Sequence, residues 1–145
     1  MTNQREAYLI DTNVISEFSA GNPHHSVFSW FKQHQTETMY LSVVTIGELE
    51  KGIARLPKSK RKTALDQWLN QKLMVQFDGY ILNTDVDTFR LWGRLSAERA
   101  KAGNKMQVGD ALIAALAKQH HLTLVTRNIS DFEGVGIELL NPWET

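Results

Sequence analysis

Short apolar runs alternate with helical segments along this chain, and this alternation constrains the fold more than any other feature of the sequence. Strands rich in β-branched and aromatic residues are predicted over residues 7–11, 39–45, 80–84, 122–126 and 137–140. Apolar residues at helical spacing predict helices over 12–20, 24–34, 46–56, 58–74, 85–102 and 110–119. Strands that alternate with helices are typical of a parallel sheet with right-handed crossovers. The chain is therefore predicted to have an α/β fold, with a central, mostly parallel sheet and helices on both faces.

Length and composition narrow the class of protein. At 145 residues and 42% hydrophobic content, the chain fits one compact domain that follows a polar lead-in at residues 1–6. The formal net charge is +0, so any affinity for nucleic acid must come from a local patch. Cysteine is absent, which excludes disulfides and thiolate zinc sites. No run approaches the ~20 apolar residues that span a bilayer, and we expect a soluble cytoplasmic protein.

Four acidic residues stand where a predicted strand passes into a helix: Asp11, Glu48, Asp110 and Asp131. In an open α/β sheet, ligands bind in the crevice at the carboxyl ends of the strands, so these carboxylates can converge there. Converged carboxylates repel one another, and a divalent cation keeps them ionised. Oxygen-only ligands favour Mg²⁺ or Mn²⁺ over zinc. The sequence thus predicts a site for one or two such ions.

Each acid also has a purely structural interpretation. Asp11 could cap the helix that follows it, and Thr45 with Glu48 fits the reciprocal capping box T-x-x-E. Asp110 could cap its helix or face solvent, and Asp131 could be a turn residue. The functional interpretation depends on their joint position at one edge of the sheet. Asp85, which precedes a predicted helix, is interpreted as a cap.

Other catalytic chemistries find little support. The five histidines, which we expect in turns or at the surface, lack the i, i+4 spacing of a metal-binding pair on a helix. No serine lies in a G-x-S-x-G setting, and glycine-rich phosphate loops are missing. A phosphatase of the haloacid dehalogenase type, with Asp11 as nucleophile, requires a second aspartate shortly after the first. This chain has Thr12 and Asn13 there.

Four motifs resemble those of PIN-domain proteins, and more narrowly those of the VapC and FitB-like toxin ribonucleases. The motifs are "LIDTNVISE", "YLSVVTIGELEKGI", "GDALIAALAKQHHLTLVTRNISDF" and "LLNPWE", and they span nearly the whole chain in the right order. The resemblance implies a single PIN-like domain that is a metal-dependent endoribonuclease. It further implies a cognate antitoxin that restrains the enzyme, promoter DNA bound through that antitoxin, and a homodimer or toxin–antitoxin hetero-oligomer. The RNA substrate could be transfer RNA.

The resemblance also assigns residues. It places Asp11, Glu48 and Asp110 in the catalytic and metal-binding set. Some relatives carry the fourth acid where this chain has Asn128, and others where it has Asp131. Of these two positions only 131 is acidic here, so the resemblance implies that Asp131 is the fourth acid, either as a metal ligand or as an acid behind the ligands. Asn13, Thr126 and Asn128 are implied as supporting polar residues.

Substrate contact requires positive charge near the acids. Arg127 flanks the predicted site and is the first candidate for an RNA phosphate contact, and Lys51, Arg55 and Arg99 are also available. An alternative function is compatible with the same fold. In this alternative, the chain is a PIN-like binding module that acts in an antitoxin and promoter-DNA complex without nuclease activity.

Overall fold

A five-stranded parallel sheet forms the centre of the molecule in the computed structural model, which describes residues 6–145. The strand order is β3-β2-β1-β4-β5, and each pair of neighbouring strands in these residues is parallel. The strands are β1 (Ala7–Ile10), β2 (Thr38–Ser42), β3 (Ile81–Leu82), β4 (Thr123–Val125) and β5 (Leu139–Leu140). The predicted α/β class is confirmed. Of the predicted lead-in, residues 1–5 lie outside the described residues.

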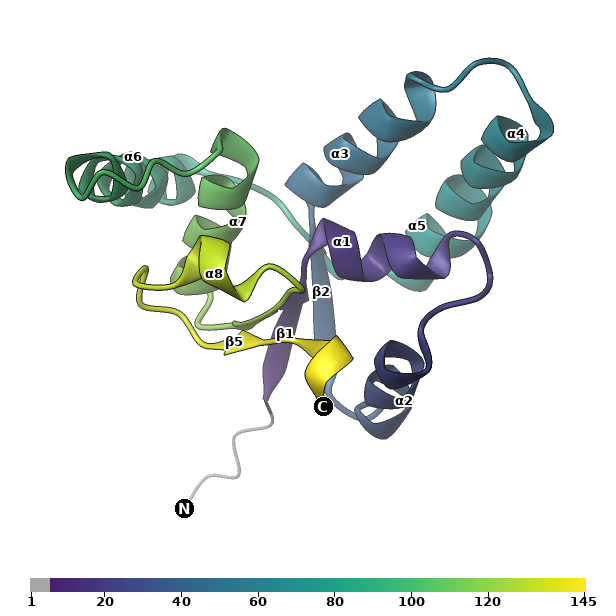
Figure 1. Cartoon of the computed structure of the whole chain (residues 1–145), viewed down its shortest axis with the longest axis horizontal. Helices are drawn as coiled ribbons and strands as arrows, with labels where there is room; N and C mark the ends of the chain where they lie inside the picture. Colours follow the sequence, from purple (N-terminus) through teal and green to yellow (C-terminus); the bar gives the residue numbers. More distant parts are fainter. Residues whose placement is uncertain (1–5) are drawn as a thin grey trace.

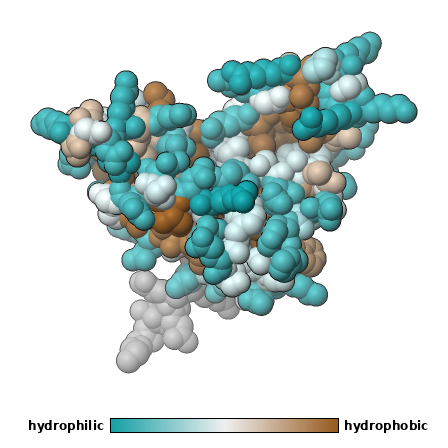
Figure 2. Space-filling view, in the orientation of Figure 1, coloured by the Kyte–Doolittle hydropathy of each residue, from teal (hydrophilic) through white to brown (hydrophobic). Residues whose placement is uncertain are grey.

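Helices connect the strands and cover the sheet (Figure 1). They are α1 (Thr12–Ile15) with its 3₁₀ continuation η1 (Ser16–Phe18), α2 (His25–Gln33), α3 (Val43–Ala54), α4 (Lys60–Gln67), the π-helical turn η2 (Trp68–Leu73), α5 (Met74–Gln76), α6 (Val86–Lys101), α7 (Val108–Gln119), α8 (Ile129–Phe132) and the 3₁₀ turn η3 (Pro142–Glu144). Figure 2 shows a largely hydrophilic face that is hollowed between the arm containing α6 and the arm formed by α3 and α4. None of the helices in residues 6–145 has the length and apolar character needed to cross a membrane.

Side chains alternate along β1 and divide the core into two layers. Tyr8 and Ile10 pack in one buried cluster with Trp30, while Leu9 packs in a second cluster with α7. Both faces of the strand are thus covered, which explains its continuous apolar sequence. Helix α7 has six buried residues, as its nearly uniform apolar character predicted. This packing fixes the carboxyl ends of β1 and β4 relative to the start of α7.

The predicted strand over 39–45 is wrong at its carboxyl end, because β2 ends at Ser42 and α3 begins at Val43. The Ser42 hydroxyl caps α3 by accepting a hydrogen bond from the Thr45 backbone N–H at 3.1 Å. The T-x-x-E capping box of Thr45 and Glu48 is therefore excluded. The structural interpretation of Asp85 is correct, since Asp85 forms a capping box with Thr88.

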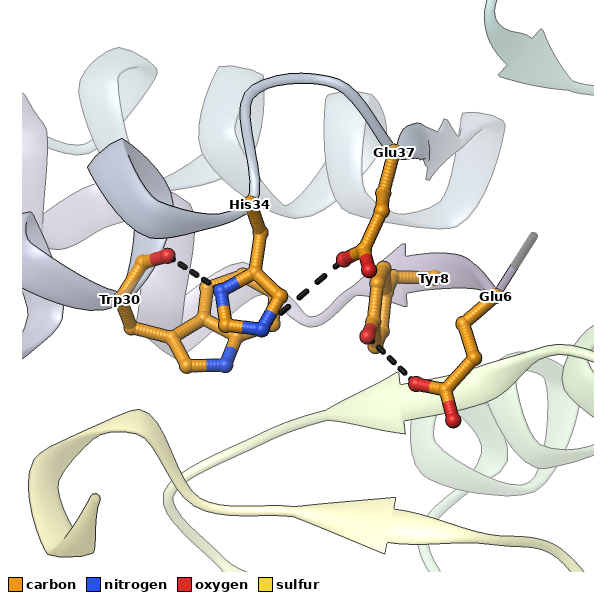
Figure 3. A network of polar contacts seen from close by, with 5 residues as sticks. All are labelled: Glu6, Tyr8, Trp30, His34 and Glu37. Atoms are coloured by element: carbon orange, nitrogen blue, oxygen red, sulfur yellow. Dashed lines mark hydrogen bonds and ion pairs between the residues drawn. The ribbon is translucent and has the colours of Figure 1, made fainter.

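A network of polar contacts lies at the amino end of β1, at the opposite end of the strand from Asp11 (Figure 3). The Tyr8 hydroxyl donates to Glu6 at 2.6 Å, and burial is the main cause that raises the pKa of Tyr8. The His34 ring stacks on Trp30 with centroids 4.4 Å apart, and its Nε2 lies 3.8 Å from a Glu37 carboxylate oxygen. His34 lies in the turn after α2, as expected, and its half-buried ring packs against the core residue Trp30.

Candidate active site

Strand β1 delivers Asp11 to the start of α1, where its side chain is 4% exposed. One carboxylate oxygen accepts a hydrogen bond from the Thr12 backbone N–H at 2.8 Å. The other accepts bonds from the Thr126 hydroxyl at 2.8 Å and the Asn13 amide at 3.2 Å. Burial raises the pKa of Asp11, while the bonds from Thr126, Thr12 and Asn13 oppose that rise and nearby Glu48 adds to it. Asp11 is thus both the predicted cap and a carboxylate fixed at the carboxyl edge of the sheet.

Glu48 reaches the same edge from the second turn of α3. Its Oε1 accepts a hydrogen bond from the Thr12 hydroxyl at 2.8 Å. The Thr12 and Thr45 hydroxyl oxygens are 2.9 Å apart, so Thr12 links α1 to α3. Sequence reasoning missed this role of Thr12. Its position between Asp11 and Asn13, at the end of a strand, was the one available signal.

Asp110 is the third residue of α7, not its first as predicted. Burial is the largest cause that raises its pKa, from the usual 3.8 to about 6, and the charges of Asp11, Asp131 and Glu48 each add to the rise. The structure therefore brings the other three predicted acids within electrostatic reach of Asp110. Gly109 lies beside Glu48, and a Cβ atom at Gly109 would meet Glu48 Oε2 at 3.4 Å, an ordinary van der Waals contact.

The segment after β4 carries the fourth acid. Asp131 is exposed and lies in α8, and Asn128 stands at the amino end of that helix without forming a side-chain cap. The Asn128 backbone N–H donates to Thr126 Oγ1 at 3.1 Å. Asn13 connects the same segment to α1 by accepting from the Arg127 backbone N–H at 3.2 Å. The residues predicted as supporting thus join the ends of β1 and β4.

The predicted basic contacts differ in their surroundings. Lys51 and Arg55 are exposed at the carboxyl end of α3. The Arg127 guanidinium lies 4.8 Å from the centre of the Trp143 ring, a cation–π contact. The Arg99 guanidinium donates hydrogen bonds to three backbone carbonyls, those of Asn104, Glu133 and Asp131. Within residues 6–145, Lys51 and Arg55 are therefore the cations of this group without such contacts.

The four carboxylates supply only oxygen donors, which suit a hard divalent cation. Their mutual repulsion, which raises the pKa of Asp110, is what such a cation relieves. Within residues 6–145, no three acidic or histidine side chains are drawn together tightly enough to ligate a single ion in this conformation. The residues thus fit a divalent cation by donor chemistry and charge.

Comparison with known proteins gives a consistent result. A protein-family model described as "PIN domain" matches residues 8–137. The plasmid stability protein StbB of Pseudomonas syringae pv. tomato is 38% identical over 136 residues, covering 94% of this chain and 98% of StbB. The VapC ribonuclease Y4jK of Sinorhizobium fredii is 36% identical over 136 residues, covering 94% and 97%. The crystal structure of FitAcB from Neisseria gonorrhoeae matches with a TM-score of 0.87 and 35% identity, over 95% of this chain and 99% of that chain.

Proposed function

The chain belongs to the PIN-domain family, as a toxin ribonuclease of the VapC and FitB-like type, and on this premise we propose that its acidic cluster is the catalytic site for metal-dependent RNA hydrolysis. One observation carries the proposal. The Asp110 carboxylate at the start of α7 lies in the field of three other carboxylates from α1, α3 and α8. Charges delivered from four separate elements to one edge of a sheet are typical of a ligand site.

In this proposal, Asp11, Glu48, Asp110 and Asp131 hold one or two Mg²⁺ or Mn²⁺ ions. A divalent ion supplies Lewis-acid chemistry, which polarises the phosphodiester and eases deprotonation of the attacking water. Asp11 is already oriented by hydrogen bonds from Thr126 and Asn13. Glu48 and Asp131, whose side chains are exposed, would complete the ligand set with Asp11 and Asp110.

The remaining residues orient the site and the substrate. Thr12 directs Glu48 through the 2.8 Å bond from its hydroxyl. The Asn128 backbone N–H donates to Thr126 Oγ1, whose hydroxyl donates in turn to Asp11. Lys51 and Arg55 attract RNA phosphates. Both lie at the carboxyl end of α3, the helix that also carries Glu48. Arg127 contributes positive charge from its position over Trp143.

Relatives guide the proposal for substrate and partners. The tRNA(fMet)-specific endonuclease VapC of Shigella flexneri is 30% identical over 129 residues, which supports a transfer RNA substrate. The structure of FitAB bound to an IR36 DNA fragment matches with a TM-score of 0.86 and 33% identity, over 94% of this chain and 95% of that chain. It supports a cognate antitoxin, through which promoter DNA is bound. We propose that the protein acts in the cytoplasm, as a homodimer or as a toxin–antitoxin hetero-oligomer.

The DNA-bound FitAB structure supports a role in a promoter-DNA complex, and the alternative function is such a binding role without nuclease activity. One experiment separates the two functions. Antitoxin-free protein is incubated with total RNA and with transfer RNA in Mg²⁺, Mn²⁺ or EDTA, beside Asp11→Asn and Asp110→Asn proteins matched for folding. Asp78→Asn serves as a control, because Asp78 is exposed in a turn outside the acidic cluster.

The ribonuclease function predicts cleavage that requires metal, is lost in Asp11→Asn and Asp110→Asn, and persists in Asp78→Asn. Cleavage that survives EDTA or both site substitutions would contradict the proposed site. A folded protein that cuts neither RNA sample with either metal would favour the binding module.

A further inference from the structure

The short helix α8 carries Asp131 but has few bonds of its own to fix its position. It spans four residues, Ile129–Phe132, and its amino end has no side-chain cap. A helix this short is not stable by itself. Asp131 is exposed, and within residues 6–145 its hydrogen bonds run through its backbone, to Asn128 and Arg99. The position of its carboxylate therefore depends on whatever holds the α8 backbone.

Two residues hold that backbone. Phe132 is 1% exposed and anchors α8 in the apolar cluster beneath it. The Arg99 guanidinium contacts the other end of the segment, where Nη2 donates to the Asp131 carbonyl at 3.2 Å and Nη1 donates to the Glu133 carbonyl at 2.5 Å. Burial of Phe132 fixes the depth of α8, and the two bonds from Arg99 restrict its rotation about that anchor.

Arg99 is itself well anchored. It lies in the last turn of α6, a helix of 16 residues. Its Nε donates to the Asn104 carbonyl at 3.0 Å, and its own carbonyl accepts from the Asn104 N–H at 2.9 Å. Gly103 adopts φ +75° between them, a left-handed conformation that turns the chain back toward Arg99. The planar guanidinium thus bridges the turn after α6 to α8 with all three of its nitrogens.

We propose that Arg99 is a positioning residue of the acidic site, which places the Asp131 carboxylate for cation binding by holding the backbone of α8. The inference rests on the proposed function and deepens it. Arg99 needs no contact with metal or RNA in this role. Lysine cannot replace it fully, since an ammonium lacks the rigid fork of donors that reaches both carbonyls.

The test measures Mn²⁺ binding to the full-length, metal-free chain by titration calorimetry without RNA, so the readout is independent of cleavage. The variants are Arg99→Gln and Arg99→Lys, with Arg90→Gln as the matched control on an exposed position of α6. We expect Arg99→Gln to weaken Mn²⁺ binding about 10–100-fold, the usual loss when a residue that orients a ligand is removed. Arg99→Lys should fall between wild type and Arg99→Gln, and Arg90→Gln should match wild type.

A double-mutant cycle with Asp131→Asn separates positioning from general stabilisation. If Arg99 acts through Asp131, then Arg99→Gln should cause little further loss of Mn²⁺ affinity once Asp131→Asn is present. Additive losses would overturn the proposal, as would a lower melting temperature with wild-type Mn²⁺ affinity. Should Arg99→Gln fail to fold, the same comparison of Mn²⁺ affinity, with and without Asp131→Asn, is made with Arg99→Lys. Wild-type protein that binds no Mn²⁺ would overturn the proposed function together with this inference, whereas unchanged affinity in the variants alone would overturn only the inference.

Discussion

Replacing Asp110 by Asn should make the metal-free protein more stable while removing its ribonuclease activity. Burial and three neighbouring carboxylates raise the pKa of Asp110 from 3.8 to about 6, so its ionised form is unfavourable in the folded chain. The neutral amide has nearly the same shape and no charge. The substitution therefore removes repulsion with little change in packing.

The size of the effect follows from the pKa. A rise from 3.8 to about 6 corresponds to about 3 kcal/mol, at about 1.36 kcal/mol per pKa unit. Asp110 is partly exposed, so solvent screening reduces this figure to about 1–2 kcal/mol. A gain of that size raises the melting temperature of a chain of this length by about 3–8 °C.

The sign of the pH dependence is fixed by linkage. A carboxyl group with a raised folded pKa binds its proton more tightly in the folded state, so its ionisation costs stability as pH rises from 3.8 to about 6. The advantage of Asp110→Asn should be absent below this range, grow through it and stay constant above it. Urea denaturation in EDTA at a series of pH values measures the difference directly.

Two results would refute this reasoning. The first is a variant that is no more stable than wild type near neutral pH, which would mean that burial and the neighbouring carboxylates do not disfavour ionised Asp110 in solution. The second is a stability gain of equal size at all pH values, which would trace to helix propensity or packing. Added Mn²⁺ should stabilise wild type and reverse the ranking, because a ligand that binds only the folded state raises its stability.

Three other substitutions test particular contacts. Thr12→Val removes the hydroxyl that donates to Glu48 at 2.8 Å, and we expect a loss of about 10-fold or more in Mn²⁺ affinity with a small change in melting temperature. Gly109→Ala adds a Cβ at an ordinary contact distance, 3.4 Å from Glu48 Oε2, so Mg²⁺-dependent RNA cleavage should be retained while urea stability holds or rises by up to about 1 kcal/mol. Leu116→Ala opens a cavity at a residue that is 0% exposed, and urea denaturation should show a loss of about 2–5 kcal/mol. Wild-type Mn²⁺ affinity in Thr12→Val, a loss of urea stability in Gly109→Ala, or wild-type urea stability in Leu116→Ala would contradict the reasoning for that residue.

Much of the fold could be predicted from local pattern. The alternation of apolar runs and helical segments determined the fold class, since each element must bury an apolar face. The residues at which helices and strands begin and end were predicted less well. Val43 and Val44 favour a strand by propensity, yet they begin α3 because the Ser42 hydroxyl caps the helix before them. Ser42 has an exposed fraction of 0%, which a local pattern does not reveal.

The acidic residues were predicted because strand ends in a parallel sheet share one edge. Their partners were not. Thr12 and Glu48 are 36 positions apart, and Asp11 and Thr126 are 115 apart, so neither hydrogen bond follows from local spacing. Arg99 illustrates the same limit, since its charge suggested an RNA contact while its guanidinium binds backbone carbonyls 32 and 34 positions away.

The sequence by itself thus determined which residue types reach the edge of the sheet, because periodicity and turn chemistry act over a few residues at a time. Only the tertiary structure decided the strand order, the rise in the Asp110 pKa and the attachment of α8 to Arg99. Each of these depends on distances between segments that are remote in the chain. Those distances are set when the two apolar layers pack on opposite faces of the sheet.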